Sequence, residues 1–174
     1  FTGRSSLSPP PQRQKQVSIQ DCIRLNKLIC SATSYEKLTT IIFQHHSDFN
    51  EVNTATACSQ LAKKKTYNDH VYPVMMVDLE VAINRNISKF KPQELANTAW
   101  AFAKLNCRLP EALIRELQAP NAGYHTFKPQ DLANTAWAFA TLNCPLPKAL
   151  IRELQAPNAG YRAFSPQNLA NTAW

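Results

Sequence analysis

Polar side chains recur at a spacing of 37 residues in the second half of the chain. Carboxylate and amide oxygens accept hydrogen bonds from nucleobase edges, amides also donate them, and lysine ammonium groups contact phosphates. Such a ladder predicts contacts with single-stranded RNA. The candidate RNA-binding residues are Glu94, Asp131 and Asn168 at one position, Asn97, Asn134 and Asn171 at a second, and the lysines Lys91, Lys104 and Lys128.

Each of these positions also has a structural interpretation. Glu94 and its equivalents fall at the third residue of a predicted helix, where an acid or amide caps free N–H groups, and we favour this capping role. For Asn97 and its equivalents we favour a hydrogen bond to the backbone of the neighbouring repeat. Each lysine taken alone is expected to be a solvated surface residue, and Ser165 and Thr141 interrupt the lysine ladder.

Residue patterns typical of enzymes and metal sites are missing from the sequence. His45 and His46 lie near Asp48 but have no further carboxylate or cysteine at a metal-ligand spacing. The five cysteines include no CxxC pair, which argues against zinc and favours reduced, partly buried thiols. Three glycines cannot form a glycine-rich phosphate loop. We therefore expect no catalytic residue, metal, cofactor or small-molecule substrate.

The composition is that of a basic chain able to bury a core. It has 174 residues, a net charge of +7 and 44% hydrophobic residues. A positive balance favours acidic partners such as nucleic acid or an acidic protein surface. No apolar run is long enough to predict a membrane span.

Nearly identical segments cover residues 90–126 and 127–163, and a third copy begins at residue 164. The segment from Phe49 aligns without gaps on the segment from Phe90, so it is interpreted as a degenerate earlier copy. The predicted organisation is a disordered linker over 1–16, degenerate helical repeats over 17–89, complete repeats over 90–126 and 127–163, and a truncated repeat over 164–174. Because the last copy stops within its motif, we expect a piece of a longer array.

Each copy is predicted to contain two helices. Pro92 suits the first turn of helix A, and Pro110 opens helix B. Leu95, Ala96, Ala99, Trp100, Phe102 and Ala103 are expected on the apolar face of helix A, and Glu94, Asn97, Thr98, Ala101 and Lys104 on its polar face. In the degenerate region, Ser18, Thr33 and Asn50 are expected to cap three helices, and Pro73 to begin a fourth.

One helix pair cannot bury its apolar face alone, but stacked pairs can. The predicted fold is therefore all-α, an α-solenoid of stacked antiparallel helix pairs with a period of 37 residues. The tryptophans at 100, 137 and 174 are expected to form a ladder inside the stack, while the polar face of helix A forms the binding surface.

The run PQELANTAWAFAKL resembles the octotricopeptide repeat, the helix-pair repeat associated with RAP proteins. The likeness covers roughly residues 24–174. It implies an RNA-binding factor of chloroplasts or mitochondria that acts in RNA processing, stability or translation. The same run resembles a 37-residue repeat of unknown function in intracellular bacteria, which implies a cytoplasmic or secreted module aimed at host targets.

Two functions follow as expectations. The first is an RNA-binding post-transcriptional factor with single-stranded RNA as its partner. The alternative is a protein-binding solenoid, in the form of a secreted bacterial effector module. The modest charge and the interrupted lysine ladder favour this alternative.

Overall fold

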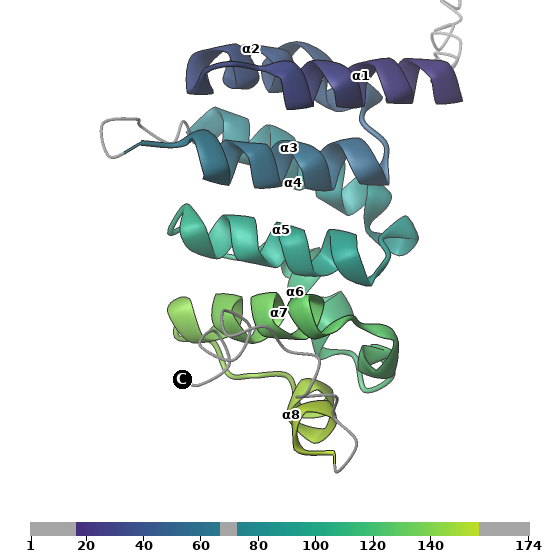
Figure 1. Cartoon of the computed structure of the whole chain (residues 1–174), viewed down its shortest axis with the longest axis vertical. Helices are drawn as coiled ribbons and strands as arrows, with labels where there is room; N and C mark the ends of the chain where they lie inside the picture. The colour runs from purple at the N-terminus through teal and green to yellow at the C-terminus, as the bar shows by residue number, and fades with distance from the viewer. Residues whose placement is uncertain (1–16, 67–72, 157–174) are drawn as a thin grey trace, which may run out of the picture.

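A computed structural model describes residues 17–66 and 73–156, and this part of the chain is all-helical, as predicted (Figure 1). The α-helices are α1 (Ile19–Ser31), α2 (Tyr35–His45), α3 (Glu51–Lys64), α4 (Pro73–Asn86), α5 (Pro92–Lys104), α6 (Glu111–Gln118), α7 (Pro129–Thr141) and α8 (Lys148–Gln155). The predicted linker over 1–16 and the truncated repeat over 164–174 lie outside the described residues.

The helices form two layers along one stacking direction (Figure 1). The odd-numbered helices pack on one another in the order α1, α3, α5 and α7. Helices α2, α4 and α6 lie behind them, and α8 lies below α7 at the end of the stack (Figure 1). Each odd helix packs against the even helix that follows it in the chain. This arrangement is the predicted solenoid of stacked helix pairs.

A short 3-10 turn precedes α3, α5 and α7. The three turns are η1 (His46–Asp48), η2 (Ile87–Lys89) and η3 (Tyr124–Thr126). A phenylalanine in extended conformation follows each turn, and Phe49 and Phe127 are buried. The degenerate segment thus enters its helix by the same local structure as the two later repeats.

Side-chain caps fix where the helices begin. Ser18 Oγ accepts a hydrogen bond from Asp21 N, and Asn50 Oδ1 accepts one from Asn53 N, as predicted. The prediction of a Thr33 cap is wrong by one residue, because Ser34 caps α2. A hydroxyl at either position suits this role, so the sequence alone does not separate them.

Asparagine in the left-handed conformation ends α5 and α7. Asn106 has φ 55° and Asn143 has φ 53°. Cys107 N donates to Phe102 O at 2.9 Å, and Asn106 N donates to Ala103 O at 3.0 Å, which is a Schellman motif. Asparagine tolerates this conformation better than most residues, so its recurrence marks the helix ends.

Small residues allow the odd-numbered helices to approach closely. Asn53 Nδ2 donates to Cys22 O at 2.9 Å, so the third residue of α3 faces the preceding helix α1. Stepping 100° per residue from the equivalent position in α5 places Thr98 and Ala101 on the side toward α3, and Ala99 on the side toward α7. All three have no exposed surface.

This packing corrects the predicted polar face of helix A. Thr98 and Ala101 were expected at the surface but are buried. A helix inside a stack contacts a helix on each side and the second layer behind it. Only a narrow arc of the helix surface is left exposed to solvent. The prediction divided helix A into an apolar and a polar face, and it therefore assigned too many residues to the exposed surface.

Membrane insertion of a helix has no support in the structure. Within residues 17–66 and 73–156, every helix is too short or too polar to span a bilayer.

Two threonines at the same repeat position provide a matched test of the packing. Thr98 Oγ1 is buried without a hydrogen-bond partner among the described residues, whereas Thr135 Oγ1 donates to Asp131 O at 2.8 Å. We expect Thr98→Val to raise the free energy of unfolding by about 1 kcal/mol, because an unsatisfied hydroxyl is removed. Thr135→Val should lower it by about 0.5–1 kcal/mol. Urea denaturation measures both, and equal losses would contradict the assignment.

Candidate binding groove

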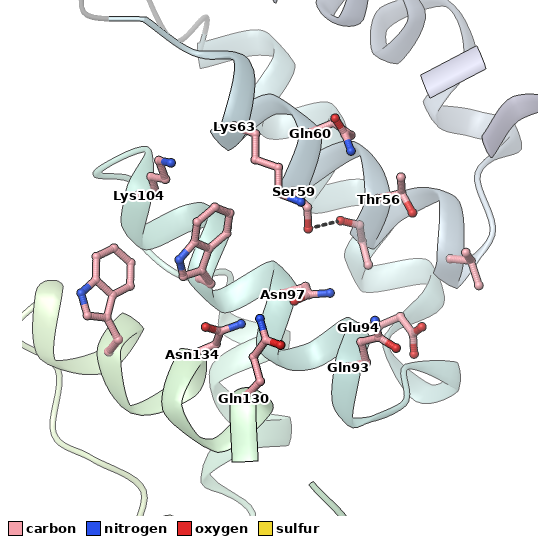
Figure 2. A pocket seen from close by; sticks show the side chains of 14 residues that line it. Thr56, Ser59, Gln60, Lys63, Gln93, Glu94, Asn97, Lys104, Gln130 and Asn134 are labelled. Atoms are coloured by element: carbon pink, nitrogen blue, oxygen red, sulfur yellow. Dashed lines mark hydrogen bonds between the residues drawn. The ribbon is translucent and has the colours of Figure 1, made fainter. Parts of the chain in front are cut away.

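One open groove runs across the exposed arcs of α3, α5 and α7 (Figure 2). Its volume is ≈ 750 Å³. We call it the A-helix groove, and its lining is Val52, Ala55, Thr56, Ser59, Gln60, Lys63, Gln93, Glu94, Asn97, Trp100, Lys104, Gln130, Asn134 and Trp137. The groove therefore crosses three successive repeats.

The three helices contribute the same positions to the groove. If the first residue of each helix is counted as residue 1, then residues 2, 6, 9 and 13 lie on one face, because this spacing follows the helical period. These four positions hold Val52, Thr56, Ser59 and Lys63 in α3, Gln93, Asn97, Trp100 and Lys104 in α5, and Gln130, Asn134, Trp137 and Thr141 in α7, and all of them except Thr141 line the groove. We call each set a row.

The lysines of the rows lie at one end of the groove. Figure 2 shows Lys63 and Lys104 on the same side, beyond the amide side chains. Lys104 Nζ lies 5.0 Å from the centroid of the Trp100 ring, a cation–π contact. The other two candidate lysines, Lys91 and Lys128, are exposed but do not line the groove. The basic edge thus consists of Lys63 and Lys104.

Amides occupy the middle of the groove. Figure 2 shows Asn97, Asn134 and Gln130 pointing into the same space. Within the described residues, the side chains of Asn97 and Asn134 make no hydrogen bond, so the favoured bond to the neighbouring repeat's backbone is wrong. Asn53 makes that bond instead, to Cys22 O. The two repeat asparagines are therefore available to a ligand.

The third residue of each helix serves mainly as a cap. Glu94 Oε2 accepts a hydrogen bond from Lys91 N at 2.8 Å, and Asp131 Oδ2 accepts one from Lys128 N at 3.2 Å. Glu94 also lines the groove, whereas Asp131 is buried outside it. Burial raises the pKa of the Asp131 carboxyl, partly offset by the Lys128 backbone hydrogen bond and charge. The structure thus separates two residues that the sequence treats as equivalent.

The predicted tryptophan ladder in the core is wrong for the two described rings. Trp100 and Trp137 are partly buried against the core, and both line the groove. Each tryptophan follows a groove glutamine, Gln93 or Gln130, by seven residues, which is about two helical turns. It therefore lies on the exposed arc of the helix and not on a face that packs against a neighbouring helix. Trp174, Asn168 and Asn171 lie outside the described residues.

Several lining residues were missed by sequence reasoning. Gln93 and Gln130 are unchanged between the two complete copies, as are the two tryptophans. The spacing of these residues places them on the same helix face as the asparagines, and this signal in the sequence could have identified them. Val52, Thr56 and Ser59 carry no comparable signal, because the α3 row shares almost no residues with the others.

No described cysteine or histidine side chain lines the groove. The five cysteines are free thiols, and burial raises the pKa of Cys58 to about 12. In the described part of the chain, no group of three histidine, cysteine or acidic side chains could hold a metal ion. His46 Nε2 lies 3.7 Å from Asp78 Oδ1, outside the groove.

A family model described as "Protein of unknown function (DUF1601)" matches three segments of the chain, residues 78–98, 117–135 and 153–172. The first two segments each run from an even-numbered helix through a 3-10 turn into the next odd-numbered helix. Most of the third lies outside the described residues. None of the curated proteins matches the chain. The matches support a helical repeat of unknown function.

The raised pKa of Asp131 leads to a pH-dependent prediction. Its charged form is disfavoured in the folded state, so its contribution to stability decreases as pH rises through the interval between the unfolded-state and folded-state pKa values. We expect Asp131→Asn to be more stable than the parent at pH 7, with a smaller difference at pH 4. Asparagine keeps the capping oxygen, as Asn53 does in α3.

Urea denaturation at the two pH values measures this effect. Glu94→Gln is the matched control, since its carboxylate is only partly buried, and it should show no such gain. An Asp131→Asn protein less stable than the parent at pH 7 would contradict the assignment.

Proposed function

We propose that the A-helix groove binds single-stranded RNA and that the protein acts as a post-transcriptional RNA-binding factor. The observation that carries this proposal is the combination of a lysine edge, free amides and partly exposed indoles in one groove. Lysines contact phosphates, aromatic rings stack on bases, and amides pair with base edges. Few other ligands use all three.

The charge distribution supports a polyanionic ligand. Within residues 17–66 and 73–156, the groove lining holds two lysines and one carboxylate, Glu94, and the whole chain carries +7. In α1, the positions equivalent to the rows are Gln20, Arg24, Lys27 and Ser31, and all four are exposed. Arg24 Nη2 lies 3.6 Å from Asp21 Oδ1, which offsets its charge, and Lys27 adds a positive charge on the first helix pair.

Binding without catalysis is part of the proposal. Among the described residues, the groove lining contains no histidine or cysteine, and its single carboxylate already accepts a hydrogen bond from a backbone N–H. Acid–base or nucleophilic catalysis needs a second group within hydrogen-bond reach. The resemblance to octotricopeptide repeats adds the expectation of a role in gene expression in a chloroplast or mitochondrion.

A protein-binding groove is the second candidate. Amide side chains also pair with the backbone of an extended peptide, and indoles pack against aliphatic side chains. Thr141 in place of a lysine and the carboxylate of Glu94 favour this reading, because both weaken the basic edge. An acidic or neutral peptide segment would fit the lining better than a basic one.

Salt-dependent binding tests the proposal. Fluorescence anisotropy of a labelled oligouridylate should show binding that weakens as salt is added, with a slope of about 0.7 per phosphate contact on a double logarithmic plot. The double variant Lys63→Gln/Lys104→Gln should lose about 1.4 from that slope and bind roughly tenfold more weakly at low salt. A DNA strand of equivalent sequence shows whether the 2′-hydroxyl contributes.

The matched control removes the same charge from the opposite layer. Lys37 in α2 and Lys148 in α8 are exposed and lie outside the groove, so Lys37→Gln/Lys148→Gln should change the slope little. If the parent binds no RNA at low salt, or if both double variants lose equally, the groove is not an RNA site.

A further inference from the structure

We propose that α5 and α7 each hold one nucleotide across the A-helix groove and select the same base at two successive positions. The inference rests on the proposed RNA binding and adds the orientation and specificity of the bound strand. It assigns base reading to Gln93 and Asn97 in α5 and to Gln130 and Asn134 in α7. The capping residues Glu94 and Asp131 have no reading role in it.

The order of side chains along α5 fits the length of a nucleotide. A helix rises 1.5 Å per residue, so Lys104 and Asn97 are about 10 Å apart along the axis, with Trp100 between them. This distance is comparable with that from a phosphate to the far edge of its base. A strand running along the stack can therefore place its phosphate at Lys104, its base on the indole and its base edge at the amides.

The contacts already made within α5 agree with this orientation. Lys104 Nζ lies over the Trp100 ring, so a base that stacks on this face displaces the ammonium, which stays within reach of the phosphate of the same nucleotide. The Asn97 amide makes no hydrogen bond to a described residue and points into the groove (Figure 2). Glu94, by contrast, is held by Lys91 N at 2.8 Å. The amide is thus the freer group for pairing with a base.

Because the rows of α5 and α7 hold the same amides and tryptophan, they are expected to select the same base. Gln, Asn and Trp occupy the same three positions in α5 and α7, and neighbouring packed helices lie about 8–10 Å apart. Other helical repeats read one base per repeat with two or three side chains. Equal amides and indoles in equal positions select the same base, so the preferred sequence contains a repeated nucleotide. Thr141 stands where α5 has Lys104, so the α7 row differs in its phosphate contact and not in its base-reading side chains.

The α3 row has a different role. Val52, Thr56 and Ser59 provide neither an indole nor a pair of amides, and Ser59 Oγ donates to Ala55 O at 2.9 Å. Lys63 remains at the basic edge of the groove. This row can hold a phosphate but has little means to distinguish bases, so selectivity is confined to the two later rows.

Short labelled RNA strands test the inference on the full chain. Among oligoadenylate, oligocytidylate and oligouridylate, one should bind about tenfold more tightly than the weakest at a single salt concentration. In a strand of the weakest base, two adjacent preferred nucleotides should restore most of the affinity. The same two nucleotides separated by one other should restore less than half of that gain.

Substitution of the amides should abolish the preference but not the binding. Asn97→Ser/Asn134→Ser should bring the three strands within about twofold of one another and leave the salt slope unchanged. Gln118→Ser/Gln155→Ser, which alters exposed amides on α6 and α8, is the matched control and should keep the parent's preference. Circular dichroism melting verifies that each variant is folded.

The outcomes separate this inference from the function beneath it. If no RNA strand binds, both fall together. If RNA binds with the expected salt slope but all three strands bind equally, or the preference survives in the asparagine variant, only the reading rows are overturned. The test with adjacent and separated nucleotides uses the unmodified protein, so its result does not depend on any variant folding.

Discussion

Close packing between the odd-numbered helices is the constraint on which the rest of the structure depends. Helix axes can approach only as far as the side chains between them permit, and here those side chains are alanine, threonine and cysteine. Ala99 and Ala101 on opposite sides of α5 have no exposed surface. The recurrence of small residues on the packed sides of α3, α5 and α7 is therefore a packing requirement.

Once three sides of each odd helix are buried, one arc remains for ligands. The arcs of α3, α5 and α7 join into a single groove because the helices share one register. In all three helices the side chains at the second, sixth and ninth positions line that groove. The array can thus vary its chemistry from row to row, as it does between the Val52 row and the Gln93 row.

The sequence predicted the solenoid, the helix pairs and the Ser18 and Asn50 caps because these depend on local signals and on the repeat itself. It failed for Trp100, Thr98 and Ala101, since a two-faced helix is the wrong description of a helix with neighbours on both sides. It also failed for Asn97, because the hydrogen bond to the neighbouring helix is made in α3 by Asn53, at the position of Glu94 rather than of Asn97. The difference between Glu94 and Asp131 arises from tertiary burial, which identical local sequences cannot reveal.

The central claim is that an extended single strand lies along the joined arcs of the odd-numbered helices. The most direct measurement is NMR of the labelled full chain during titration with single-stranded RNA. The account predicts shifts of the indole N–H signals of Trp100 and Trp137 and of the Asn97 and Asn134 side-chain amides, with little change in α4 and α6. Shifts confined to the even-numbered helices, or unchanged groove signals in the presence of bound RNA, would contradict it.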